Sequence, residues 1–154
     1  MFALTMGLKA TRVEIAPGEL APGGPTLVVA AVDAAPTPAE RYRGARPGTP
    51  LLAGAPFVAL VRSGPLLSAD TCELSESSSE GKTFQLTLDV RRYTGPIHVD
   101  AERELLFEVD LGAPSPGRYA VVVTTTALEF QDRQHPERTA NPSKTEARVE
   151  FDLL

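Results

Sequence analysis

Residues 105–128 constrain the fold of this 154-residue chain more than any other stretch. Apolar and polar residues alternate from Leu105 to Leu111, which is the period of a strand with one buried face. A turn rich in Pro and Gly follows, and then residues 118–130 form a second apolar segment with Tyr119 near its start. Because 118–130 is apolar on both faces, we expect it to be a central strand.

The same criteria predict further strands at residues 8–15, 26–32, 57–61, 66–74, 82–90 and 147–153, with a short extension at 97–99. Segment 26–32 is apolar on both phases and is expected to be a central strand covered on both sides. A phase slip near Thr11 and Arg12 predicts a bulge or a strand that switches sheets. The polar stretches 75–82 and 131–144 are expected to be exposed loops. Seven to nine short strands separated by turns predict an all-β antiparallel β-sandwich, one domain over residues 1–154.

The inward faces of these strands predict the buried core of the sandwich. We expect it to include Val13, Ile15, Val29, Phe57, Val61, Phe84, Leu86, Leu88, Phe107, Val109, Tyr119, Val121, Val123, Val149 and Phe151.

Residues 33–56 form an unusually long, Pro-rich connection. Within it, Thr37, Pro38 and Glu40 supply an N-cap, a first-turn proline and a third-position carboxylate. They predict one short helix over 38–43 that ends near Gly44. Long connections in compact domains are often functional, so this segment is a candidate for binding.

Two segments resemble immunoglobulin-like and fibronectin type III-like domains. Residues 13–32 are a strand, a Pro-Gly turn and an apolar strand, and in residues 111–123 Tyr119 is similar to a tyrosine-corner residue. The resemblance implies that the Tyr119 hydroxyl bonds to backbone a few residues upstream. The chain departs from these families because it has no tryptophan and no cysteine pair. The resemblance implies a domain that binds, spaces or caps other proteins.

Charge and hydropathy exclude several classes of partner. The net charge is −5 and the pI about 5.1, so nucleic-acid binding, which needs a basic face, is not expected. The longest apolar run, residues 27–32, is far shorter than the roughly 20 residues that cross a bilayer, so no membrane insertion is expected. Without a signal-peptide pattern and with only one cysteine, we expect a cytoplasmic protein, although an exported mature domain would look the same.

No motif for nucleophilic catalysis is present. The histidines are His98 and His135, and no Gly-x-Ser-x-Gly elbow occurs. Cys72 lies between Asp70 and Glu73, which disfavour a thiolate, and we expect it to be buried and structural. We therefore expect no enzyme and no cofactor.

Metal binding is also not expected. His98 and Asp100 could supply two ligands, but zinc needs three or four. The acidic residues Asp70, Glu73, Glu76 and Glu80 are spaced too sparsely for a calcium loop.

Binding surfaces remain the most informative candidates. Tyr and Arg are over-represented at interface hot spots, and they gather in two clusters: Arg41, Tyr42, Arg43 and Arg46 in the long connection, and Arg91, Arg92 and Tyr93 after the predicted strand 82–90. The end loop 131–144 is a third candidate. Our leading hypothesis is a non-enzymatic protein-binding or assembly module that acts through end loops or an edge strand.

Two alternatives remain open. The Pro-rich segment 33–56 could insert into the cleft of an enzyme, which would make the protein a regulator or inhibitor. The chain could also be an enzyme with a motif-free site or a carbohydrate-binding domain. Its 6% aromatic content and its lack of tryptophan count against the stacking that sugars require.

Overall fold

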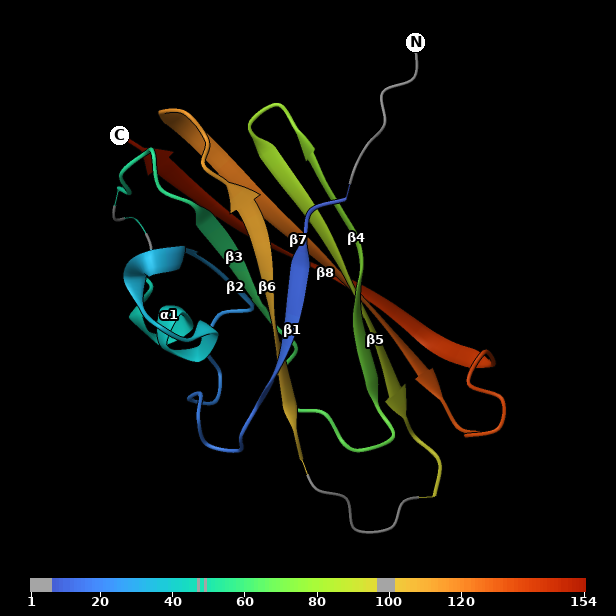
Figure 1. Cartoon of the computed structure of the whole chain (residues 1–154). Helices are drawn as coiled ribbons and strands as arrows, with labels where there is room; N and C mark the ends of the chain where they lie inside the picture. The colour runs from blue at the N-terminus through green and yellow to red at the C-terminus, as the bar shows by residue number, and fades with distance from the viewer. Residues whose placement is uncertain (1–6, 47, 49, 97–101) are drawn as a thin grey trace.

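The computed structural model describes residues 7–46, 48, 50–96 and 102–154. Within these residues the chain forms eight strands in two four-stranded sheets and one α-helix (Figure 1). The first sheet has the order β1-β6-β3-β2, with β1 Ala10–Ile15, β6 Glu104–Gly112, β3 Phe57–Arg62 and β2 Leu27–Ala31. The second has the order β4-β5-β7-β8, with β4 Thr71–Glu80, β5 Thr83–Tyr93, β7 Gly117–Phe130 and β8 Thr139–Leu153. The predicted all-β sandwich is confirmed, while the expected extension at 97–99 lies outside the described residues.

One strand pair departs from the expected antiparallel arrangement. β5 and β7 run parallel, with Phe84 opposite Val121 and Tyr93 opposite Phe130. The strand between them in the chain, β6, belongs to the other sheet. After β5 the chain enters the first sheet as β6 and then returns to the second sheet as β7. β7 runs in the same direction as β5, because β6 serves as the crossover connection that a parallel pair requires.

The main core lies between the two sheets, and the alternation predicted for β5 and β6 is confirmed. Of the fifteen expected core residues, all are buried except Val13, Val29 and Val149, which are half-buried. Val29 and Val149 lie on β2 and β8, the edge strands of the two sheets. Val13 and Ile15 pack in a second apolar cluster on the other side of the first sheet.

That second cluster lies under the helix α1 (Pro38–Gly44), which covers the outer face of the first sheet (Figure 1). The helix confirms the predicted one, and the Thr37 hydroxyl caps it by accepting the Glu40 N–H at 3.2 Å. A 3-10 turn, η1 (Val32–Ala34), connects β2 to it. Because α1 and the second sheet cover opposite faces of β2, this strand is apolar on both phases although it is an edge strand, not the central strand we expected.

Two polar stretches predicted to be loops are partly strands. Residues 75–80 belong to β4, which pairs with β5 from Thr71 to Glu80 around a bulge after Leu74. The connecting loop has two residues, and Gly81 at φ 61° occupies its first position, as in type II′ hairpins. β8 begins at Thr139, so the loop before it is shorter than predicted. The bulge expected in β1 is absent, because β1 pairs with β6 in continuous register.

Tyr119 behaves as the resemblance implied. Its hydroxyl donates to the Ser115 carbonyl at 2.8 Å, which fixes the turn between β6 and β7. Its ring stacks with Phe84 and Phe151 at centroid distances of 6.2 and 5.7 Å. The residue therefore joins the turn to the main core.

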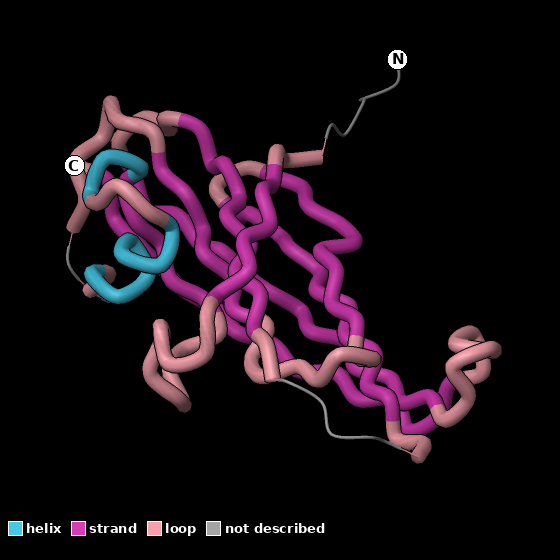
Figure 2. Tube along the Cα trace, turned by 60° about the horizontal axis from the view of Figure 1, so that its bottom comes forward, coloured by secondary structure: helices cyan, strands magenta, loops and turns pink. Residues whose placement is uncertain are grey.

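The far end of the β7–β8 hairpin projects from the body of the sandwich in both views (Figures 1 and 2). These strands have 14 and 15 residues, whereas those of the first sheet have between 5 and 9. The first sheet therefore cannot cover their whole length, and β8 is exposed from Thr139 to Glu146. Within the described residues no helix is long and apolar enough to cross a membrane.

Candidate binding site

The first predicted cluster is divided between the protein interior and its surface. The Arg41 side chain is 11% exposed, and its Nε donates to the Val32 and Ala35 carbonyls at 2.7 and 2.9 Å. Its guanidinium also pairs with Glu108 of β6 at 2.5 Å. Arg41 thus fastens the helix to the sheet beneath it.

Tyr42 is buried against the outer face of the first sheet. Its hydroxyl donates to the Pro25 carbonyl at 2.6 Å and accepts from Arg62 at 3.3 Å. The Arg62 guanidinium lies 5.5 Å from the centroid of the ring and pairs with Glu104 through two contacts. The hydrogen bond to Glu104 is the main cause that raises the pKa of Arg62, so the buried guanidinium stays charged. Tyr42 is a packing residue and is not accessible to a partner.

Arg43 and Arg46 are exposed. Arg43 donates to the Glu19 carbonyl at 2.9 Å, and Arg46 donates to the Arg43 and Ala45 carbonyls at the end of the helix. Binding through these two arginines stays a prediction.

The second predicted cluster, Arg91, Arg92 and Tyr93, lies at the C-terminal end of β5. Arg91 donates to a backbone carbonyl of the 131–138 loop, and Arg92 lies 3.7 Å from the buried carboxylate of Asp70. The Tyr93 ring is covered by Arg133, whose guanidinium carbon lies 4.7 Å from its centroid. Arg91 and Arg92 remain exposed, so binding through them also stays a prediction.

The side chains considered for chemistry are separated. Cys72 is 2% exposed, which confirms that it is buried, and burial raises the pKa of its thiol to about 12. Asp70 accepts the N–H groups of Leu67 and Tyr93 and so holds a turn. His135 lies on the surface beside Glu137. The pair His98 and Asp100 lies outside the described residues, and among those described no three His, Cys, Asp or Glu side chains cluster as a metal site.

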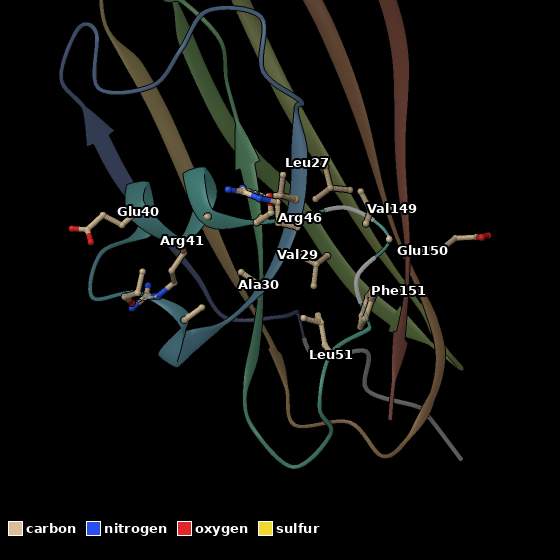
Figure 3. Close-up of a pocket in the computed structure, with 16 residues that line it drawn as sticks. Leu27, Val29, Ala30, Glu40, Arg41, Arg46, Leu51, Val149, Glu150 and Phe151 are labelled. Atoms are coloured by element: carbon tan, nitrogen blue, oxygen red, sulfur yellow. Dashed lines mark hydrogen bonds between the residues drawn. The ribbon is translucent and has the colours of Figure 1, made fainter.

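An apolar groove of about 270 Å³ lies where the edges of the two sheets meet (Figure 3). β2 forms one wall, the end of β8 forms the other, and α1 with the segment after it closes the outer side. Figure 3 shows Leu27, Val29, Leu51, Val149 and Phe151 gathered around it, while Glu40 and Glu150 point away. The described lining residues are Leu27, Val28, Val29, Ala30, Ala34, Ala35, Glu40, Arg41, Gly44, Ala45, Arg46, Gly48, Leu51, Val149, Glu150 and Phe151.

Backbone groups of β2 face the groove. The bonds at the two ends of the β2–β3 ladder, Arg62 N–H to Thr26 and Val32 N–H to Pro56, place the even-numbered residues of β2 toward β3. The N–H and C=O groups of Leu27, Val29 and Ala31 therefore point away from β3. The sheet order ends at β2, so among the described residues no strand pairs with this edge.

The edge of β8, unlike that of β2, is hydrogen-bonded to another segment at its C-terminal end. Leu51 donates to the Asp152 carbonyl at 2.9 Å and accepts from the Leu154 N–H at 2.9 Å, while Ala53 donates to Leu154 at 3.0 Å. The segment 51–53 is thus a short parallel addition to β8. It brings Leu52 next to Leu154, and these two are the exposed large hydrophobic residues of the described chain, at 76% and 67% exposure.

The lining of the groove is mainly apolar. Among its described lining residues there is no hydroxyl, thiol or imidazole group. Glu150 is held ionised at the rim, because its hydrogen bonds to Arg118 and then Arg148 lower its pKa. Sequence reasoning missed the groove since residues more than a hundred positions apart build it; the half-buried positions of β2 and β8 were the only local signal.

Comparison of the chain with protein families, with curated proteins and with solved structures found no match.

Proposed function

We propose that this protein is a non-enzymatic binding module that takes an extended apolar segment of another protein into the groove between β2 and β8. The observation that carries the proposal is the combination of an apolar lining with a backbone edge of β2 that no strand of the described residues pairs with. An extended peptide would bond to the edge through its backbone and place alternate side chains in the groove, the mode called β-augmentation.

The size of the groove suits single side chains of a bound peptide. Pockets for small ligands occupy about 300–1,000 Å³, and this groove holds about 270 Å³. That is room for a few side chains. Leu52, which follows the groove residue Leu51, and Leu154 are also exposed, and exposed apolar side chains of this size support a protein interface.

We favour this function over the two alternatives. A loop that enters the cleft of an enzyme has to stand clear of its own domain, whereas residues 33–46 are held against the first sheet by Arg41 and Tyr42. A catalytic site or a sugar platform would need nucleophilic, acid–base or stacking groups inside the groove; its carboxylates, Glu40 and Glu150, point away from it, and Phe151 is the aromatic residue of the described lining.

We also propose that the sandwich is immunoglobulin-like in style. The bond from Tyr119 to the Ser115 carbonyl supports this assignment. The parallel pair of β5 and β7 is a departure that a comparison of topologies would have to accommodate.

The binding function is tested by selecting peptides of about a dozen residues from a random display library. We expect binders with apolar residues at alternate positions, and amide chemical-shift changes in residues 27–31 and 149–151. Ala34→Arg places a large charged side chain at the groove and should abolish binding, whereas Ala21→Arg, another exposed alanine outside the groove lining, should not. Selection of no peptide, or shift changes confined to other strands, would contradict the proposal.

A further inference from the structure

The outer edge of β8 is exposed over most of its length. β8 pairs with β7 in continuous register from Ser143 to Leu153, and no strand of the described chain follows it in the sheet. Because the Asp152 carbonyl and the Leu154 N–H face Leu51, the even-numbered backbone groups of this stretch point away from β7. The outward-facing residues between the ends are Lys144, Glu146, Arg148 and Glu150.

Both ends of this open edge are bounded. At one end the segment 51–53 already bonds to Asp152 and Leu154. At the other end Pro142 has no N–H to donate, and Asn141 has φ 51° at a register shift. Such a bulge bends its strand. An added strand can therefore pair with residues 144–150 only, a segment whose centre is Ala147.

The charges along this edge alternate in sign: Lys144, Glu146, Arg148, Glu150. In an antiparallel pairing of two copies centred on Ala147, Lys144 faces Glu150 of the second copy, and Glu146 faces Arg148 of the second copy. Each of these pairs has opposite charges, which stabilise cross-strand neighbours. If the pairing were centred on residue 146 or residue 148 instead, Glu146 would face Glu146 or Arg148 would face Arg148 of the second copy.

The backbone satisfies the same register. Residues 146 and 148 are both even-numbered, as are 144 and 150, so each facing pair can exchange two backbone hydrogen bonds, about eight in all. Ala147 then faces Ala147 of the second copy in a non-hydrogen-bonded pair, and the two side chains that meet there are both small. Charged residues on an edge strand usually discourage pairing with other strands; here their order makes the edge complementary to itself.

We propose that a second copy of this chain pairs antiparallel with the β8 edge about Ala147, so that the two second sheets form one continuous eight-stranded sheet. In this register residue 142 of each copy faces Asp152 of the other, so the paired stretch ends where the bulge of one copy meets the segment 51–53 of the other. This interface shares Val149 and Glu150 with the groove proposed to bind peptides, but the groove variant Ala34→Arg lies in η1 and leaves the β8 edge unchanged.

Charge reversal tests the interface without touching the core. Sedimentation velocity over a concentration series should show a reversible dimer for the wild-type protein. One variant carries Lys144→Glu with Arg148→Glu, and a second carries Glu146→Lys with Glu150→Lys; each should be monomeric, because every facing pair becomes like-charged. An equimolar mixture of the two should restore a heterodimer. The proposal would be overturned by a monomeric wild-type protein, by a dimer of either charge-reversed variant alone, or by a mixture of the two variants that stays monomeric.

A cysteine at the centre tests the register. Ala147→Cys should form a disulfide-linked dimer under mild oxidation, because the two positions face each other. Thr145→Cys is the matched control: it faces Val149 of the second copy, so two such cysteines lie too far apart to bond efficiently. The native Cys72 is buried and does not compete. Equal crosslinking of both variants, or none of Ala147→Cys, would refute this register.

Discussion

Tyr42 distinguishes a packing role for the 33–56 segment from a role as a surface hot spot. The Tyr42→Ala change removes a buried ring from beneath α1, together with the hydroxyl that donates to Pro25 at 2.6 Å. Truncation of a large buried aromatic side chain costs about 3–5 kcal/mol. For a chain of this length, each kcal/mol lowers the melting temperature by about 2–4 °C, so we expect a decrease of about 6–20 °C.

Tyr42→Phe separates the hydrogen bond from the packing. It keeps the ring but leaves the Pro25 carbonyl without this donor, which should cost about 1–2 kcal/mol. Arg43→Ala is the control, because Arg43 is exposed and makes one bond to the Glu19 carbonyl; its effect should stay within about 0.5 kcal/mol.

Equilibrium unfolding in urea and a thermal scan followed by circular dichroism measure all three variants. If Tyr42→Ala melts within 2 °C of the wild-type protein, α1 does not pack on the first sheet as described, and the surface role of this cluster regains its support. The order Ala, then Phe, then the Arg43 control, from largest to smallest loss, is the result that the packing requires.

Three further predictions concern single positions. A Cβ added at Gly24 would lie 2.6 Å from the Tyr42 hydroxyl, so Gly24→Ala should lower stability in urea, whereas Gly44→Ala, with open space around it, should not. Burial raises the pKa of Cys72 from 9.0 to about 12, so a thiol reagent at pH 8 should modify it only after unfolding; since the unfolded chain ionises first, stability should fall as the pH rises above about 9, and a pH-independent stability there would contradict this. Tyr119→Phe should cost about 0.5–1.5 kcal/mol in urea unfolding through loss of its backbone bond, and an unchanged midpoint would show that the bond contributes nothing.

Local patterns were sufficient for the faces of several strands and for the helix. The alternation in β5 and β6 identified which side chains are buried, because a strand repeats every two residues regardless of its neighbours. Thr37, Pro38 and Glu40 located the start of α1, since the cap is made within one turn. The Tyr119 bond also spans only four residues.

Polar segments were predicted less well because their structure depends on a partner. Residues 75–80 are strand since β5 pairs with them, and their side chains can remain polar because the outer face of that sheet meets solvent. A polar sequence looks the same whether it forms the solvated face of such a strand or an exposed loop, so local pattern could not distinguish the two.

The sequence by itself determined the all-β class, the core-facing side of its regular strands and the short helix, because these follow from residues close together in the chain. Only the tertiary structure decided that β5 and β7 are parallel, that β2 is an edge strand covered by α1, and that Tyr42 is buried while Arg43 beside it is exposed. The groove and the free edge of β8 belong to the same category. Each depends on contacts between elements that are distant in sequence, and the free energy that selects those contacts comes from burial of their shared surface, which no local pattern records.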